Sequence, residues 1–211
     1  MELNQIICGD TLTELKKMPD EFVDLIITSP PYFGLRNYGV EGQLGLEKTF
    51  TEFLEKMLEI TAELKRILKP TGQFWLNMGD CYGTKSGGTE QLVKGVDSTQ
   101  YGKIEYKAAK FAVSQDRNKL VQEKSLLMQP ERIAIAMIDK QGWILRNKIK
   151  WAKQILLSKQ NKTIGSVMPS SVKDRFNESG EEFYFFLKNK KYYENLDAVR
   201  LKIQTEENRP Q

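Results

Sequence analysis

Short apolar runs alternate with amphipathic stretches over the first 70 residues. Residues 5–9 (QIICG) and 22–28 (FVDLIIT) are apolar and rich in β-branched side chains, which is typical of buried strands. The stretch between them, residues 11–17, predicts a short helix. From Thr49 to Leu68, apolar residues recur at three- and four-residue spacing, and Thr49 with Glu52 fits a capping box. This pattern predicts a long amphipathic helix.

A third strand is predicted at residues 73–78 (QFWLNM), after Pro70 and Gly72 end the helix. Strand, helix and strand joined by short connections favour a parallel α/β sheet. Ligands bind such sheets at the carboxyl ends of the strands. Asp10, the loop that begins at Ser29 and Asp80 each follow a predicted strand. We therefore expect all three to lie on one edge of the sheet and to face one crevice.

The second half of the chain is more polar and less periodic. Its expected elements are a polar insertion or mobile loop at 81–123, a helix from Pro130 to Lys140, a half-buried strand at 143–151, a polar loop at 154–168, a buried strand at 182–187 and a short hairpin partner from Lys191. The resulting divisions are a catalytic α/β region at 1–82, a polar insertion at 83–125, a second α/β region with an inserted basic loop at 126–200 and a frayed tail at 201–211.

Composition indicates a globular protein of the cytoplasm. The 211 residues, 40% of them hydrophobic, suffice for one domain with a sizeable core. No run approaches the ~18 apolar residues of a membrane span, and residues 1–4 (MELN) lack the features of a signal peptide. The two cysteines, Cys8 and Cys81, form no CxxC pair, so we expect both to be reduced.

Histidine is absent from the chain. This composition excludes Ser-His-Asp and Cys-His nucleophilic chemistry as well as metals held by histidine. We expect no metal site. Any catalysis must use carboxylates, hydroxyls, backbone groups or a cofactor.

The net charge of +4 is unevenly distributed. Residues 103–165 hold 14 Lys and Arg against 5 Asp and Glu, a surplus of +9, so the rest of the chain carries −5. Such a segment is typical of a surface that binds a polyanion, although a solvated lysine-rich surface has the same composition. If that polyanion is double-stranded DNA, we expect Lys148, Lys150 and Lys153 to contact its phosphates.

The segment with the most specific chemistry is Ser29-Pro30-Pro31-Tyr32, directly after the strand at 22–28. Two prolines fix the backbone and hold a carbonyl outward, and Ser29 adds a hydroxyl. Together they can accept hydrogen bonds from the exocyclic amine of a base and free its lone pair for methylation. Tyr32 offers a face on which a flipped base can stack. The alternative is a rigid turn with a packed tyrosine.

The run from Ile6 to Tyr38 (ICGDTLTELKKMPDEFVDLIITSPPYFGLRNY) resembles the amino-directed DNA methyltransferases of the permuted, or beta, class, in which the catalytic region precedes the cofactor-binding region. The resemblance continues, in the family's order, through residues 66–72 (RILKPTG), 74–80 (FWLNMGD), 143–147 (WILRN), 151–153 (WAK) and 171–176 (SVKDRF). It implies an incomplete class-I, Rossmann-like α/β sheet, with an inserted basic loop or target-recognition region, that uses S-adenosylmethionine.

The resemblance also implies roles for individual residues. Ser29 and the Pro30 carbonyl would bind the target amine and, with Asp10, contact S-adenosylmethionine; Pro31 keeps the loop rigid and Tyr32 stacks on the base. An N-cap of the next helix is an equal alternative for Asp10.

Farther along the chain, the resemblance implies that Lys173 and Arg175 contact DNA phosphates or line the pocket of the target base. A plain surface location is the alternative for this basic pair. Asp80 is expected to be structural.

Two departures from the family qualify these expectations. Nothing after Tyr193 resembles the family's Phe-x-Gly-x-Gly cofactor loop. The chain is then a truncated gene product, a degenerate fragment or one subunit of a split enzyme, and we favour a chain that needs a second polypeptide to supply the loop. Where the family has Ser-His-Glu, this chain reads Ser179-Gly180-Glu181.

Serine before Pro-Pro-Tyr favours N4-cytosine as the target, in a prokaryotic or phage-encoded enzyme of restriction-modification type. The alternatives are an N6-adenine enzyme, a catalytically silent DNA-binding fragment, and an RNA or protein methyltransferase.

Overall fold

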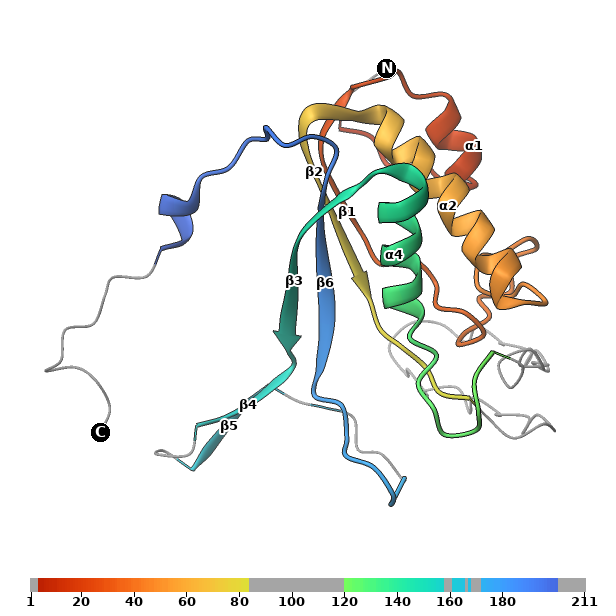
Figure 1. Ribbon diagram of the computed structural model, residues 1–211, viewed down its shortest axis with the longest axis vertical. Helices are drawn as coiled ribbons and strands as arrows, with labels where there is room; N and C mark the ends of the chain where they lie inside the picture. The colour runs from red at the N-terminus through yellow and green to blue at the C-terminus, as the bar shows by residue number, and fades with distance from the viewer. Residues whose placement is uncertain (1–3, 84–119, 158–160, 166, 168–171, 201–211) are drawn as a thin grey trace, which may run out of the picture.

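The computed structural model describes residues 4–83, 120–157, 161–165, 167 and 172–200. A four-stranded sheet with the order β1-β2-β6-β3 forms its centre (Figure 1). The strands are β1 (Val23–Thr28), β2 (Leu68–Met78), β3 (Ile144–Ala152) and β6 (Gly180–Leu187). Three α-helices accompany the sheet, α1 (Thr11–Lys16), α2 (Phe50–Ile67) and α4 (Gln129–Gln141). The part of the chain that the structure describes also contains a short hairpin of β4 (Gln154–Leu157) and β5 (Lys162–Gly165) and the 3-10 helix η2 (Leu196–Val199).

The helices begin and end where the local sequence predicts. The Thr49 hydroxyl accepts a hydrogen bond from the Glu52 amide at 3.1 Å, and the Glu52 carboxylate accepts from the Thr49 amide at 3.3 Å, so the expected capping box is present on α2. Pro130 lies in the first turn of α4, and Gly142 ends the helix in the left-handed conformation, at φ 65°.

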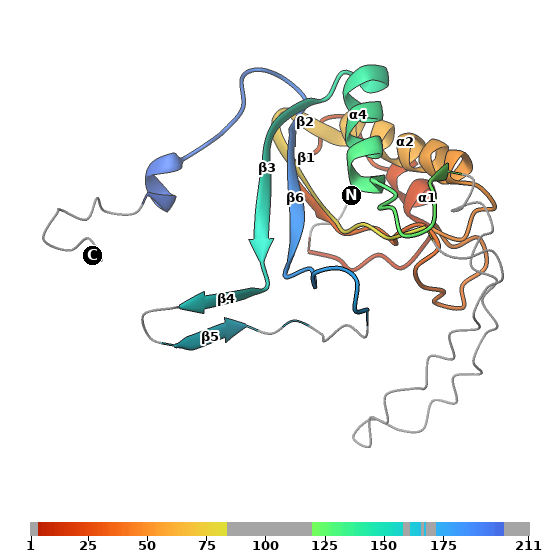
Figure 2. The ribbon, with the colours of Figure 1, turned by 60° about the horizontal axis from the view of Figure 1, so that its bottom comes forward.

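All three helices lie on one face of the sheet (Figures 1 and 2). Alternate side chains of β2 and β6 point toward them and are fully or almost fully buried; these are Phe74, Leu76, Met78, Tyr184 and Phe186. The apolar stripe of α2 supplies the other side of this core through Phe53, Met57, Leu64 and Ile67. Burial of these side chains is the main force that holds helix and sheet layers together.

The opposite face of the sheet is largely uncovered. We call it the open face and define it by Leu25, Ile27, Trp75, Phe183 and Trp151, which the pairing register of the strands puts on the side away from the helices. Trp75 stacks on Phe185 with ring centroids 4.5 Å apart, so part of this face is covered by its own aromatic rings. Leu25 and Ile27 nevertheless remain 52% and 65% exposed.

The structure corrects the expectation of a parallel sheet. β1 and β2 are parallel, as predicted, but β6 runs antiparallel to both of its neighbours, β2 and β3. The sheet is therefore mixed. Because β6 reverses direction, β1, β2 and β3 run the same way and their carboxyl ends share one edge.

Three local predictions are wrong. Residues 5–9 form no strand: they are exposed, Ile6 completely so, because no neighbouring strand pairs with them in the described structure. Residues 154–165, expected as a loop, form the β4–β5 hairpin. Lys191 begins no hairpin partner; instead Tyr192 packs edge-on against Phe185 at 5.9 Å.

Most of the predicted polar insertion, residues 84–119, lies outside the described residues. The segment on its far side closes back onto the sheet edge: the Gly83 amide donates to the Ser125 carbonyl at 2.8 Å, and the Leu127 amide donates to the Cys81 carbonyl at 2.8 Å. Among the described helices, none has the length and apolar character needed to cross a membrane.

Candidate active site at the carboxyl edge of the sheet

The Ser29–Tyr32 loop begins directly after β1, at the carboxyl edge of the sheet. Thr28, the last residue of β1, pairs with Leu76, and β2 ends two residues later at Met78. Ser29 is exposed, whereas Pro30, Pro31 and Tyr32 are half-buried. The loop after β1 and the Gly79-Asp80 pair after β2 therefore meet on one edge, as the sequence predicted.

The ring of Tyr32 lies against the backbone of Gly79. A Cβ added at Gly79 would come within 2.9 Å of the Tyr32 ring, which is closer than real contacts allow. The main chain of Tyr32 is packed in the same way against Gly45, where an added Cβ would meet the Tyr32 carbonyl oxygen at 2.7 Å. The absence of side chains at Gly79 and Gly45 thus allows Tyr32 to pack closely against both backbone segments.

The chain that follows Tyr32 is anchored in the core. Phe33 is completely buried between Phe50 and Phe53, with ring centroids at 5.6 and 5.5 Å. The Gly34 amide donates to the Gly45 carbonyl at 2.6 Å, and this tightens the loop around Tyr32. The exposed Ser29 is therefore carried on a backbone segment that is rigid at both ends.

Gln129, the first residue of α4, connects this loop to β2 and was missed by sequence reasoning. Its side chain is fully buried and accepts a hydrogen bond from the Phe33 amide at 3.0 Å. Its amide nitrogen donates to the Gly79 carbonyl at 3.2 Å and contacts the Cys81 sulfur at 2.9 Å. The sequence holds one signal for it, a polar residue next to Pro130 at the start of an amphipathic helix, but that signal also fits an ordinary cap.

Asp80 is structural, as expected. Its carboxylate accepts hydrogen bonds from the backbone amides of Cys81, Met128 and Gln129 at 2.9, 2.8 and 3.1 Å. These bonds satisfy amides at the start of α4 that have no partner within the helix. Asp80 thereby holds the helix at the end of β2.

The structure shows Asp10 as the N-cap of α1. One carboxylate oxygen accepts from the Thr13 amide at 2.9 Å and from the Thr13 hydroxyl at 2.7 Å. These hydrogen bonds, the one from the hydroxyl first, lower the pKa of Asp10, so it carries a negative charge at neutral pH. Because residues 5–9 form no strand, the reason for expecting Asp10 at the same sheet edge as Ser29 no longer holds.

Each of the three lysines predicted to contact DNA phosphates has an acidic partner. Lys148 pairs with Glu131 at 2.5 Å, Lys150 with Glu182 at 3.3 Å, and Lys153 with Glu181. The partners lie on α4 and β6, the elements beside β3. The positive charges of these three lysines are therefore balanced locally in the fold.

Lys173 and Arg175 belong to a segment that packs beside the base of the insertion. The Arg175 guanidinium lies 4.3 Å from the centre of the Tyr82 ring, a cation–π contact. Next to it, Asp174 pairs with Lys124 at 2.5 Å, and this hydrogen bond lowers the pKa of Asp174. Lys173 is exposed and makes no ion pair with any described residue.

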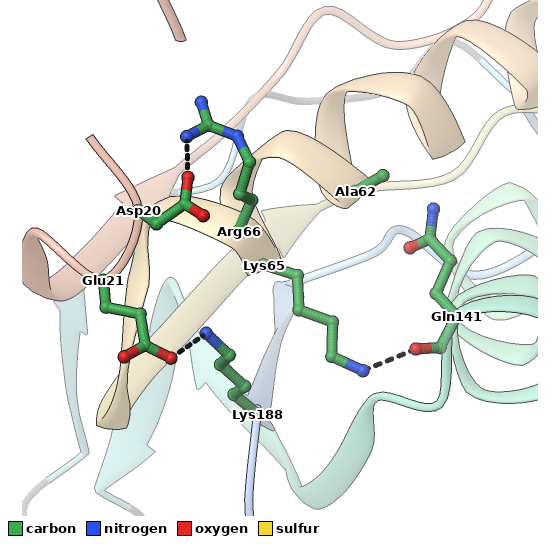
Figure 3. A pocket seen from close by; sticks show the side chains of 7 residues that line it. All are labelled: Asp20, Glu21, Ala62, Lys65, Arg66, Gln141 and Lys188. Atoms are coloured by element: carbon green, nitrogen blue, oxygen red, sulfur yellow. Dashed lines mark hydrogen bonds and ion pairs between the residues drawn. The ribbon is translucent and has the colours of Figure 1, made fainter. Parts of the chain in front are cut away.

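A polar pocket lies at the opposite edge of the sheet from Ser29 (Figure 3). Its lining comes from the turn before β1, the carboxyl ends of α2 and α4 and the residue after β6, and consists of Asp20, Glu21, Ala62, Lys65, Arg66, Gln141 and Lys188. Its cations already have partners within the protein, as Arg66 pairs with Asp20, Lys188 with Glu21, and Lys65 donates to the Gln141 carbonyl. The pocket therefore serves to hold elements together.

A sheet backed by helices on one face, with a Ser-Pro-Pro-Tyr loop at its carboxyl edge, is the arrangement expected of an amino-directed DNA methyltransferase. Comparison with known proteins gives the same class. The chain belongs to the DNA methylase family, whose N6_N4_Mtase profile matches residues 23–211. The prediction of an α/β methyltransferase fold with an incomplete sheet is thereby confirmed.

Individual relatives agree with this assignment. The Type II methyltransferase M.Cfr9I of Citrobacter freundii is 36% identical over 202 residues, which cover 95% of this chain and 60% of the relative. Among solved structures, the PvuII DNA methyltransferase (cytosine-N4-specific) aligns with a TM-score of 0.55 at 20% identity, over 93% of this chain and 53% of that one.

A second solved structure has the same fold. The Thermus thermophilus protein TTHA0409, a DNA modification methylase solved in complex with S-adenosyl-L-methionine, aligns with a TM-score of 0.51 at 18% identity, over 89% of this chain and 54% of that one. The chain thus spans between about half and 60% of the length of these proteins.

Proposed function

We propose that this chain is the catalytic half of a site-specific DNA methyltransferase that modifies the exocyclic amine of a flipped base. The observation that carries the proposal is the exposed Ser29 beside Tyr32, whose ring is fixed against Gly79 at the carboxyl edge of the sheet. A hydroxyl, a rigid carbonyl and an aromatic face lie together there. Family membership supports the same reaction class.

The residues of this loop would orient the amine and hold its protons. The Ser29 hydroxyl and the Pro30 carbonyl accept hydrogen bonds from the amine, which concentrates its lone pair on nitrogen. Pro31 keeps that carbonyl in place, and Tyr32 stacks on the base. S-adenosylmethionine would supply the methyl group as an activated sulfonium. The residues proposed to hold it are Asp10, Ser29 and Pro30.

The chain's own chemistry fits this cofactor in part. Asp10 is exposed and ionised, but one of its oxygens is already used to cap α1. The other oxygen is left for a ligand hydroxyl. Ser29 and Pro30 lie at the sheet edge where α/β folds bind ligands.

Cytosine-N4 is the base position we favour, with adenine-N6 as the alternative. Serine, not aspartate, precedes Pro-Pro-Tyr in this chain. This resembles the cytosine-N4 group, although some adenine enzymes share the serine. The PvuII DNA methyltransferase, which has the same fold, is itself cytosine-N4-specific.

We further propose that a second polypeptide carrying a Phe-x-Gly-x-Gly loop completes the enzyme and covers the open face. Parallel strands such as β1 and β2 are usually covered on both faces of their sheet. Here Ile27 is 65% exposed and β1 is an edge strand. An apolar, half-paired edge of this kind favours association with another polypeptide.

Methyl transfer to DNA tests the proposal. Labelled S-adenosylmethionine is incubated with duplex DNA and the chain, with and without a separately expressed polypeptide that carries the Phe-x-Gly-x-Gly loop, and the product nucleosides are separated. We expect label in N4-methylcytosine when both polypeptides are present. Label in N6-methyladenine would change the target base, and duplex binding without any label would favour a silent DNA-binding fragment.

Variants of the loop separate catalysis from binding. Ser29→Ala should slow single-turnover methylation of the completed enzyme and leave duplex affinity little changed, because the hydroxyl acts at the amine. Tyr32→Phe keeps the aromatic face and should retain much of the activity. Tyr32→Ala should remove a stacking contact of ~1–3 kcal/mol. Wild-type rates for Tyr32→Ala would mean that the segment is a rigid turn with a packed ring.

A further inference from the structure

The β4–β5 hairpin projects from the carboxyl end of β3, away from the helices (Figures 1 and 2). Four residue pairs join its strands, from Gln154 with Gly165 at the base to Leu157 with Lys162 near the tip. The four residues of β5 are all exposed. A two-stranded hairpin without further packing is marginally stable in water. This hairpin therefore has the properties of an element that makes its contacts with a partner.

Its charge indicates what kind of partner. Between Asp139 and Asp174 the sequence has 34 residues with eight Lys and Arg and no Asp or Glu. On β3, acidic side chains of α4 and β6 pair with two of these cations, Lys148 and Lys150. The hairpin has no such neighbour among the described residues, and Lys162 makes no ion pair with any of them. Among its described residues the hairpin thus carries a positive charge at Lys162 and no acidic side chain to balance it, which suits contact with a polyanion.

One surface of the hairpin adds an apolar contact. Ile155 pairs directly with Ile164, and both are about half exposed, at 50% and 52%. Leu157 and Lys162, two residues nearer the tip, lie on the same side, because side chains alternate along a strand. Two paired strands lie ~4.8 Å apart and four residues extend ~13 Å. A ribbon of this size fits the DNA major groove, which is ~12 Å wide and ~8.5 Å deep.

We propose that the β4–β5 hairpin is a DNA-contacting ribbon that enters the groove near the base captured by the Ser29–Tyr32 loop. Lys162 meets a phosphate, and the surface formed by Ile155, Leu157 and Ile164 lies against base edges, where apolar side chains contact thymine methyl groups. The carboxyl edge shared by β1 and β3 brings ribbon and loop to the same side of the sheet. The inference rests on the proposed action on DNA and adds where the duplex is contacted.

The test is duplex binding by the full chain and by a variant in which two glycines replace residues 154–165. The hairpin ends lie side by side, since a Cβ on Gly165 would meet the Lys153 carbonyl, so a short linker can close the gap without moving β3. We expect excision to weaken affinity for an oligonucleotide duplex by about tenfold or more at low salt, with an unchanged melting temperature. The double variant Ile155→Thr, Ile164→Thr should weaken binding less and reduce discrimination between sequences.

Salt dependence isolates the phosphate contact. Lys162→Gln should lower the slope of log affinity against log salt by about 0.9, the value for one phosphate on duplex DNA. Lys190→Gln is the matched control, since Lys190 is an exposed lysine just beyond β6, at the opposite edge, and its removal should leave the slope unchanged.

Three results would overturn the proposal: no duplex binding by the parent chain at low salt, unchanged affinity after excision, or loss of pairing with the second polypeptide while duplex affinity stays the same. The last would make the hairpin a protein-docking element. The experiment measures binding and not methylation. A parent chain that binds DNA through the hairpin yet never methylates it would therefore contradict the proposed function but still support the hairpin as a DNA contact.

Discussion

At the scale of single residues, the candidate site depends on the absence of a side chain at Gly79. The Tyr32 ring occupies the space that a Cβ would fill, at 2.9 Å. Gly79→Ala should displace the ring, and we expect a roughly tenfold slower single-turnover methylation by the completed enzyme, within the ~1–3 kcal/mol of a stacking contact. In a Tyr32→Ala background the same substitution should have almost no further effect, because the two changes act through one contact. Additive losses would contradict this coupling.

At the scale of secondary-structure elements, Gln129 ties the start of α4 to the loop after Tyr32. Gln129→Leu should remove the hydrogen bond that the buried Phe33 amide donates to the Gln129 side chain and lower the free energy of unfolding by ~1–3 kcal/mol. Gln141→Leu is the control at the far end of the same helix, where Gln141 accepts from Thr61 at 2.9 Å. Urea denaturation should show losses of stability in both variants, whereas methylation should slow mainly in Gln129→Leu. Equal activity of the two variants would make Gln129 purely structural.

A second contact between elements makes stability depend on pH. Glu131 on α4 accepts hydrogen bonds from Lys148 at 2.5 Å and from Tyr184 at 2.9 Å. Burial acts to raise the pKa of Glu131, but these two bonds outweigh it and the pKa is lowered. The folded state then binds fewer protons than the unfolded state, so this contribution is present above the ordinary glutamate pKa, ~4.3, and is lost as pH falls through the lower folded value.

Glu131→Gln should therefore reduce stability at neutral pH and flatten its decline on the acid side. Urea titrations from acid to neutral pH would measure this, with Glu55→Gln on the exposed side of α2 as the control. An acid decline as steep in Glu131→Gln as in the parent would show that other carboxylates dominate.

For the molecule as a whole, the proposed second polypeptide would both complete the cofactor site and cover the open face. We expect the isolated chain to bind S-adenosylmethionine weakly or not at all, since we propose that a second polypeptide carries the glycine-rich cofactor loop. Calorimetric titration that gives micromolar binding by the chain alone would refute this.

The open face is the proposed contact surface for the second polypeptide. Ile27→Asp should abolish association with that polypeptide yet cost the chain little stability, because Ile27 is already 65% exposed. Undiminished association would place the docking surface elsewhere.

Local patterns predicted those parts of the fold whose determinants are close in sequence. The capping box and apolar stripe of α2, the proline and glycine that bound α4, and the runs that became β1 and β6 each depend on neighbours within a few residues. The placement of the Ser29–Tyr32 loop at a strand end was predictable for the same reason, since Pro30 and Pro31 cannot continue a strand.

Contacts between distant segments decided the rest. Residues 5–9 have the composition of a strand but form none, because a strand needs a partner for its backbone groups and none is described beside them. The reversal of β6, the acidic partners of Lys148, Lys150 and Lys153, and the bond from Phe33 to Gln129, 96 residues away, each join residues far apart in the chain. The helices, most strands and the position of the Ser-Pro-Pro-Tyr loop follow from local sequence patterns. Which charges are paired follows only from the fold, because contacts between distant segments leave no local pattern.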